Sequence, residues 1–253
     1  MWFHERMVRA VLAATLCACI VLAAASAAGP KLILHGPRTH RWVALTFDAD
    51  MTQAMISDLH SGKVKSWYDR AVVATLRRTH TPATIFLTGL WTKTYPGAVR
   101  SFARDPLFEL ENHSWDHAAW AGTCYGLPAV RSVARKRAEV LQTEAIVKRV
   151  AGVQTRYFRF PGGCLTQADV RLVASLGQQP VQWDVISGDS FLTDPARVEE
   201  EVLRQVRPGS IVVLHLVGPA RTPATAPAVK YLIPKLRARG YRFVTLKKLL
   251  TPP

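Results

Sequence analysis

Cysteine is scarce in this chain, with four in 253 residues, which is too few for a fold built on disulfides. The 15 glycines and 16 prolines are scattered, which excludes collagen-like and low-complexity sequences. Acidic residues are also few, 18 against 33 lysines and arginines, and the net charge of +15 predicts attraction to anionic surfaces. Hydrophobic residues make up 49% of the chain, which is enough for one sizeable core and excludes wholesale disorder.

Long apolar runs are missing except at the N-terminus. There Arg6 and Arg9 precede a run of small and apolar residues that ends in Ala25-Ser26-Ala27. This order of charged, apolar and small residues is typical of a secretory signal, and the run is short for a membrane span. We therefore expect residues 1–27 to direct export, with an uncleaved anchor or lipid attachment at Cys19 as alternatives. The chain that remains keeps a net charge of +14.

Behind a lead-in at residues 28–41, short apolar or β-branched runs alternate with longer amphipathic segments. The runs expected as strands are 43–47, 83–87, 108–110, 157–160, 181–183, 211–214 and 243–246. The segments expected as helices are 65–78, 97–104, 128–150, 166–175, 195–206 and 224–239. Most strand runs are continuously apolar, as in parallel strands that are buried on both faces. Aromatics are not interleaved with basic residues on a strand, so nucleic-acid binding is not expected.

This alternation predicts an α/β fold with a parallel sheet. About seven strand–helix units within residues 42–253 favour a single distorted (β/α) barrel. An open doubly wound sheet is the alternative, but the sequence lacks the Gly-rich phosphate loop that usually follows the first strand of that fold. In a barrel the active site lies at the carboxyl ends of the strands, so polar residues at those ends are candidate site residues.

Two strand ends carry residues typical of a metal site. Asp48 and Asp50 follow the first strand, and residues two apart in an extended chain face the same side. Two carboxylates in one mouth repel each other unless a cation or a shared proton lies between them. His113 and His117 follow the third strand, where a helical turn would put both on one face. One carboxylate with both histidines is a ligand set of catalytic zinc, whereas a polar loop with two packed histidines is the alternative.

The other strand ends supply an arginine, a histidine and further carboxylates. Arg159 stands between two aromatics in the fourth strand, where a buried arginine needs a carboxylate, and Asp184 and Asp189 are the candidates. Gly162 leaves its backbone accessible, so its N–H is a candidate oxyanion donor. His215 ends the sixth strand, and a side chain that titrates near neutral pH suits proton donation to a leaving group. A structural salt bridge and a packed histidine are the alternatives.

In this order the motifs resemble those of the polysaccharide deacetylase (NodB homology) family, carbohydrate esterase family 4, over about residues 40–250. The matching segments are Thr46-Phe47-Asp48, His113-Ser114-Trp115-Asp116-His117, Arg159-Phe160-Pro161-Gly162-Gly163, Asp189 and Val213-Leu214-His215. The resemblance implies hydrolysis of N-acetyl groups on an N-acetylated glycan, either peptidoglycan or a chitin-like polymer. An O-acetyl esterase, another amide hydrolase of the same mechanism and a non-catalytic metal-dependent glycan-binding domain are the alternatives.

The resemblance also implies a role for each matched residue. The implied roles are Asp48 as catalytic base, His215 as acid, Gly162 as oxyanion donor, Arg159 paired with Asp189 as the support of Asp48, and Asp50, His113 and His117 as ligands of a divalent metal. Zinc is the expected metal, with cobalt and nickel as alternatives. The positive charge of the chain fits work beside an anionic cell envelope.

The chain departs from the family pattern at several positions. Ala49 intervenes between the two aspartates, Gly162 stands where the family usually has Tyr, and Ser190 stands where it usually has Trp. The lost aromatics remove parts of the usual groove wall, so the substrate need not be an ordinary chitin oligomer. Cys124 follows the second motif and Cys164 lies at the third, and their attachment to these loops favours a disulfide between them.

Overall fold

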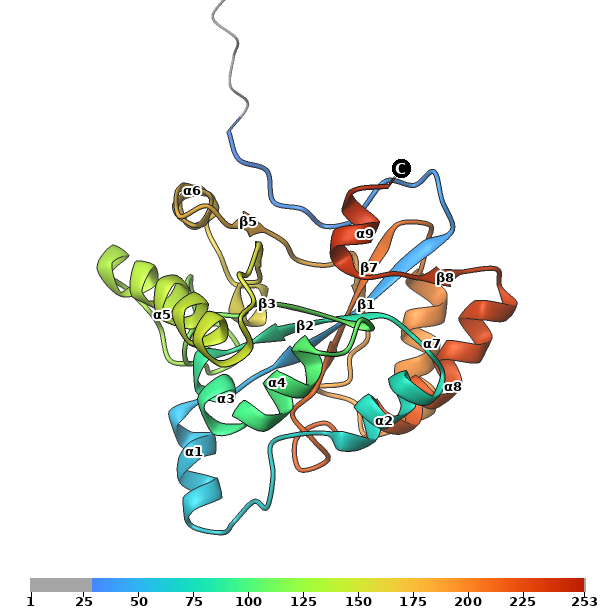
Figure 1. Ribbon diagram of the computed structural model, residues 1–253, viewed down its shortest axis with the longest axis horizontal. Coiled ribbons are helices and arrows are strands. Elements are labelled where there is room, and N and C mark those ends of the chain that lie inside the picture. The colour runs from blue at the N-terminus through green and yellow to red at the C-terminus, as the bar shows by residue number, and fades with distance from the viewer. Residues whose placement is uncertain (1–28, 253) are drawn as a thin grey trace, which may run out of the picture.

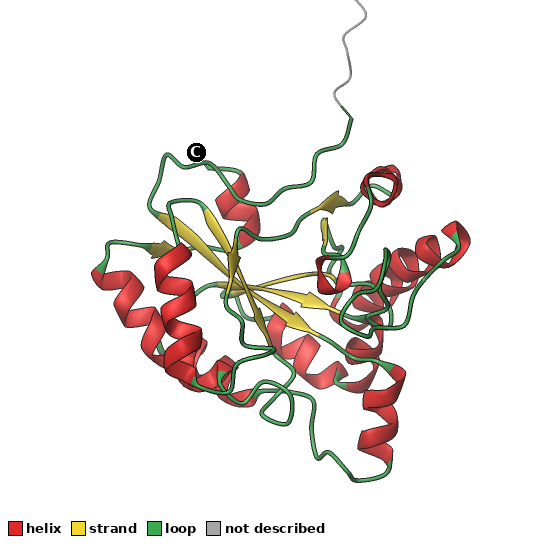
Figure 2. Cartoon of the chain, turned by 180° about the vertical axis from the view of Figure 1, so that it is seen from behind, coloured by secondary structure: helices red, strands yellow, loops and turns green. Residues whose placement is uncertain are grey.

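The computed structural model describes residues 29–252, and the signal expected at residues 1–27 lies outside them. A parallel sheet curls into a distorted half-barrel with helices around it (Figures 1 and 2). Its strands run in the order β5-β4-β3-β2-β1-β7-β6, and β8 pairs with β1. The strands are β1 Trp42–Ala49, β2 Ala83–Leu87, β3 Phe108–Asn112, β4 Tyr157–Phe158, β5 Gln179–Pro180, β6 Val185–Ile186, β7 Ser210–His215 and β8 Arg242–Phe243. The predicted α/β fold with about seven parallel strands is confirmed.

Helices lie between most successive strands, and most of them cover the outer face of the sheet. They are α1 Gln53–His60, α2 Arg70–Arg78, α3 Gly89–Thr94, α4 Pro96–Ala103, α5 Val133–Ala151, α6 Gln167–Ser175, α7 Pro195–Gln205, α8 Thr225–Ala238 and α9 Leu246–Leu250, with a 3₁₀ turn η1 at Pro161–Gly163. Side chains cap the starts of α6 and α7. Thr166 and Asp169 form a reciprocal capping box at the start of α6, and the Asp194 carboxylate accepts the Ala196 N–H at the start of α7. Within the described part of the chain, no helix is both long and apolar enough to cross a membrane.

The alternation of side chains along β1 decides which residues reach the site. Val43, Leu45 and Phe47 belong to the large core shared with the covering helices. Ala44 belongs to a separate cluster inside the half-barrel, and Asp48 lies on the same side of the strand because side chains alternate with a period of two. In the parallel pairing of β1 with β7, Asp48 is the register partner of His215. The last polar residues of two adjacent strands therefore face the same interior.

The long helix α5 begins later than the sequence predicts. We expected it to start at Pro128, but its first residue is Val133, and the Ser132 hydroxyl accepts the Arg135 N–H as its N-cap. The Pro128 carbonyl instead accepts the Ala119 N–H at 2.7 Å. This pairing holds the preceding segment as a short bridge against the loop after β3, so tertiary contacts override the helical pattern there.

The strand expected at residues 181–183 is displaced. The sheet pairs at β5, two residues earlier, while Val181 donates one hydrogen bond to the Phe158 carbonyl and makes an isolated bridge with Ile33 of the lead-in. The lead-in is therefore part of the fold, because the Ile33 N–H donates to the Pro180 carbonyl of β5 and the Ile33 carbonyl accepts the Gln182 N–H.

Candidate active site

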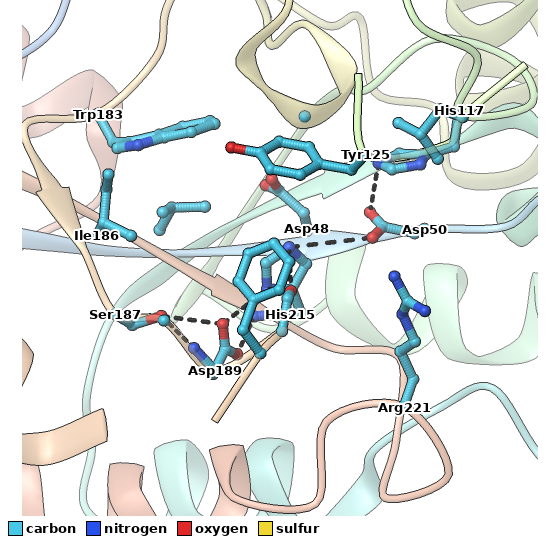
Figure 3. Close-up of a pocket in the computed structure, with 16 residues that line it drawn as sticks. Asp48, Asp50, His117, Tyr125, Trp183, Ile186, Ser187, Asp189, His215 and Arg221 are labelled. Atoms are coloured by element: carbon cyan, nitrogen blue, oxygen red, sulfur yellow. Dashed lines mark hydrogen bonds and ion pairs between the residues drawn. The ribbon is translucent and has the colours of Figure 1, made fainter. Parts of the chain in front are cut away.

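Asp48 and Asp50 face one mouth, as the spacing predicts. Asp48 is 3% exposed at the end of β1, and its Oδ1 accepts a hydrogen bond from Arg159 Nη1 at 2.6 Å. Asp50 follows β1, and its carboxylate lies beside His117 (Figure 3). Asp50 also approaches His215 of β7, whose Nε2 is 4.0 Å from Asp50 Oδ2.

The predicted pairing of Arg159 with Asp189 is wrong, because Arg159 binds Asp48 directly. Its guanidinium is fully buried, with Cζ 3.9 Å from the centroid of the Phe86 ring and 5.5 Å from that of Trp183. Burial lowers the pKa of Arg159, and the Asp48 carboxylate opposes that shift. The planar guanidinium of Arg159 lies between the Phe86 and Trp183 rings and has little freedom to rotate. Arg159 therefore fixes the orientation of the Asp48 carboxylate.

The other two carboxylates considered for Arg159 are engaged elsewhere. Asp184 binds Arg38 at 2.7 Å and accepts the Ile211 N–H at 2.8 Å. Asp189 Oδ1 lies 2.8 Å from Nδ1 of His215, and its Oδ2 accepts the His215 backbone N–H and the Thr225 hydroxyl. The sequence does not distinguish these partners, because all three carboxylates follow strands that converge on the same end of the sheet.

The Asp189 carboxylate sets the charge of His215. Burial alone would lower the pKa of His215, but Asp189, Asp50 and Asp48 raise it to about 10. Burial would raise the pKa of Asp189, but His215 and the Thr225 hydroxyl hold it below its usual value. His215 therefore carries a proton at neutral pH, with Nδ1 facing Asp189 and Nε2 on the side of Asp50.

His113 and His117 come together in a loop after β3, and not on the helical turn that we expected. Ser114 and His117 both have positive φ, at 67° and 58°, a conformation that a regular helix does not contain. The buried Glu139 of α5 stabilises this loop, because its Oε2 accepts the Trp115 N–H at 2.7 Å. The backbone reversal, rather than helical periodicity, brings the two rings to a centroid distance of 5.0 Å.

Asp50, His113 and His117 form a candidate metal site. Nε2 of each histidine lies 3.4 Å from Asp50 Oδ1, and two ligands of a tetrahedral zinc ion are about 3.3 Å apart. Asp50 Oδ1 and His113 Nε2 are buried atoms without a hydrogen-bond partner among the described residues. His113 Nδ1 lies 2.9 Å from the Arg159 carbonyl, and donation to this carbonyl leaves the Nε2 lone pair free for a metal.

The protonation of these ligands also fits a cation. Burial lowers the pKa of His117 to about 4, against the opposing effect of Asp50, so the ring is neutral at neutral pH. Burial would raise the pKa of Asp50, but the neighbouring histidines hold it well below its usual range. One carboxylate and two imidazoles are suitable donors for zinc and leave coordination positions open for other ligands.

The predicted disulfide between Cys124 and Cys164 is present and ties the loop after β3 to η1. Gly162, within η1, has φ of 60°, in the left-handed region that glycine adopts without strain. No acceptor meets its N–H among the described residues, and the residue lines the same hollow as the aspartates. The backbone donor expected at this position therefore has no internal acceptor among the described residues.

Several side chains that line this hollow are not predicted from the sequence. The full lining is Asp48, Asp50, His117, Tyr125, Leu127, Gly162, Trp183, Ile186, Ser187, Gly188, Asp189, Ser190, Phe191, Val213, His215 and Arg221. The aromatic members and Arg221 come from loops outside the recognised motifs. In Figure 3 the rings of Tyr125 and Trp183 lie on one side of Asp48, and Arg221 extends toward Asp50. No pattern in a single sequence marks these loop residues, since their positions depend on how the loops close over the sheet.

Comparison with known proteins establishes the family of this chain. The polysaccharide deacetylase family matches residues 35–181, more than half of the chain. The chain belongs to the polysaccharide deacetylase family. A peptidoglycan-N-acetylglucosamine deacetylase of Bacillus cereus is 25% identical over 218 residues, covering 85% of this chain and 70% of that protein. A chitooligosaccharide deacetylase of Azorhizobium caulinodans is 28% identical over 184 residues, covering 68% of this chain and 82% of that protein.

Solved structures of the family share the fold. A carbohydrate esterase 4 pseudoenzyme from Bacillus anthracis superposes with a TM-score of 0.71 at 22% identity, covering 88% of this chain and 70% of that chain. At this identity the likeness establishes the polysaccharide deacetylase fold alone. The catalytic competence of this chain has to be argued from its own residues.

Proposed function

We propose that this chain is a metal-dependent hydrolase that removes N-acetyl groups from an amino-sugar glycan. The observation that carries the proposal is the pairing at the mouth of the half-barrel. Arg159 binds Asp48 and Asp189 binds His215. The candidate metal site adjoins both pairs, since His113 Nε2 lies 3.6 Å from Asp48 Oδ2 and Asp50 Oδ2 lies 4.0 Å from His215 Nε2. A carboxylate base and a protonated histidine beside a metal site are the groups that amide hydrolysis requires.

Asp50, His113 and His117 would hold a divalent metal, with zinc as the first candidate and cobalt or nickel as alternatives. The bound metal would supply a Lewis acid to the amide carbonyl and to the attacking water. The geometric fit rests on the 3.4 Å separations between donor atoms and on the unpartnered buried Asp50 Oδ1.

Three groups of the chain would carry the protons and the developing charge. Asp48, held by Arg159, accepts the proton of the attacking water. The Gly162 N–H donates to the carbonyl oxygen as negative charge develops there. His215 gives its proton to the leaving nitrogen, and Asp189 stabilises the imidazolium until that step. The bond that breaks is the amide C–N bond, and the products are acetate and a free amine.

Peptidoglycan is the substrate that the charge of the site favours. The two relatives compared above are named for peptidoglycan and for chitooligosaccharides. Arg221 is exposed at the mouth and makes no ion pair with any residue that the structure describes. A cation there would attract a carboxylate on a substrate sugar or peptide, and the +14 charge of the exported chain acts in the same direction. Export by residues 1–27 would bring the enzyme to this polymer.

The proposal is tested by acetate release from N-acetylglucosamine oligomers and from peptidoglycan. Asp48→Asn should lower the rate at least about a hundredfold, since it removes the base. Asp105→Asn is the matched control, because Asp105 precedes β3 at the end of the strands opposite the site and pairs with Arg77. Turnover by Asp48→Asn within twofold of the unaltered chain would show that Asp48 is not the base.

The same assay separates the two alternatives. An O-acetyl esterase would hydrolyse small aryl acetates and leave N-acetylglucosamine oligomers intact. A glycan-binding domain would bind the oligomers without releasing acetate; the pseudoenzyme with this fold and the altered motifs make that outcome worth measuring.

A further inference from the structure

Two exposed aromatic rings meet over the hollow of the candidate active site. Tyr125, on the loop after β3, is 70% exposed, and Phe191, after β6, is 68% exposed. Their ring centroids are 5.4 Å apart, with the planes tilted by 49°. Both rings line the hollow that contains Asp48, and neither contributes to a buried core. Exposed apolar rings of this kind, next to reactive groups, are typical of a ligand-binding surface.

Tyr125 also stands between two hollows. The first contains Asp48 and His215, and the second extends along α1 toward Trp67. Tyr125 and the candidate metal ligands Asp50 and His117 line both. A chain of sugars that places one unit at the reactive groups therefore has room for a neighbouring unit on the far side of the Tyr125 ring.

The ring is held in place by covalent and steric constraints. The preceding residue, Cys124, is 2% exposed and is joined to Cys164 by the disulfide. Tyr125 has φ of 49°, so the backbone reverses at the ring. A Cβ on Gly162 would lie 2.5 Å from Cys124 Sγ and 3.2 Å from Tyr125 Cδ2. The disulfide and the Tyr125 ring thus fill the space that a side chain at Gly162 would need.

We propose that Tyr125, positioned by the Cys124–Cys164 disulfide and paired with Phe191, is a binding platform for a sugar ring of the substrate glycan. The platform compensates for the aromatic residue missing at Gly162, because a ring from a different loop covers that position. An aromatic face packs against the apolar C–H face of a pyranose and leaves the hydroxyls in water. This inference rests on the proposed function for the identity of the ligand, but it concerns binding rather than hydrolysis.

The test is the affinity for the tetramer of N-acetylglucosamine, measured by calorimetry on zinc-loaded protein in an Asp48→Asn background. Tyr125→Ala should weaken binding about tenfold, and Tyr125→Phe should stay within twofold, because the ring and not the hydroxyl makes the contact. Tyr231→Ala is the matched control, since Tyr231 is an exposed tyrosine of α8 outside the hollow. Zinc content and circular dichroism verify that each variant is folded.

The disulfide gives a second, independent test. Reduction of Cys124–Cys164 in the folded protein should weaken tetramer binding by a similar factor. In the Tyr125→Ala variant, reduction should change the affinity for the tetramer little. Equal affinity of Tyr125→Ala and the parent, at equal zinc content, would overturn the platform, as would a parent that binds no tetramer. Tetramer binding that depends on Tyr125, without acetate release by the unaltered chain, would support the platform and refute the deacetylase.

Discussion

The contact between Asp189 and His215 predicts how activity depends on pH. His215 must be protonated to donate to the leaving nitrogen, so activity is present below its pKa and is lost as the pH rises through it. Asp189 is the largest favourable contribution to the raised pKa of His215, which is about 10. The contributions of Asp50 and Asp48 decrease when a divalent cation lies beside them, so the loaded enzyme should lose activity somewhat below that pH.

Replacement of Asp189 by Asn removes the charge and keeps an oxygen that accepts the Nδ1 proton at the 2.8 Å contact. An adjacent opposite charge shifts a pKa by about 1–3 units, so we expect the basic limb of the pH profile of kcat to move down by that amount. One pH unit above the new pKa, about a tenth of the enzyme retains the proton.

The assay is acetate release between pH 5 and pH 10 at fixed zinc. Asp184→Asn is the control, because this nearby carboxylate binds Arg38 and the Ile211 N–H and makes no contact with His215. The control should change stability and leave the limb in place. If the pKa of the basic limb in Asp189→Asn lies within about 0.3 units of that in the parent, His215 is not an acid whose proton is stabilised by Asp189.

Other substitutions test other parts of the account. Arg159→Lys replaces a planar guanidinium by a compact ammonium charge. We expect kcat to fall about a hundredfold with unchanged zinc content, because Asp48 loses its orientation. An unchanged kcat would show that Arg159 does not orient Asp48. Replacing both Cys124 and Cys164 by Ser should lower the free energy of unfolding, measured by denaturant titration, by about 4 kcal/mol. This is the loop-closure entropy expected for cysteines separated by 40 residues. Equal stability would show that the disulfide does not constrain the unfolded chain. Arg221→Gln should raise KM for peptidoglycan fragments about threefold and leave KM for neutral oligomers unchanged. The effect is small because a surface charge pair contributes less than about 1 kcal/mol. Equal effects on both substrates would count against an anionic group of the substrate at Arg221.

The fold was largely predictable because its strands are continuous apolar runs. Residues 83–87 became β2 with unchanged bounds, since a run buried on both faces has no competing pattern. The start of α5 was not predictable, because the segment at Pro128 satisfies the helical period and yet bonds to Ala119. Short strands such as β6 were also missed, as two residues carry no periodicity.

The polar residues of the site were predictable one by one, but their partners were not. Asp48, Asp50 and His215 were recognised because each ends an apolar strand, and the structure brings them together. The partner of Arg159 depends on the side of the half-barrel from which its side chain reaches the interior, which the spacing of residues does not encode. Tyr125 and Phe191 are missed for a related reason, because two loops 66 positions apart in sequence meet only after the sheet has curled.

The central claim is that a metal at Asp50, His113 and His117 is required for acetate release. The most direct test strips the protein with a chelator, restores zinc in steps, and measures bound zinc and acetate release from N-acetylglucosamine oligomers and peptidoglycan in the same samples. We expect activity to be lost on stripping and to return in proportion to bound zinc, with a plateau at one ion per chain. One bound zinc per chain without acetate from either polymer would contradict it, as would acetate release that persists after stripping.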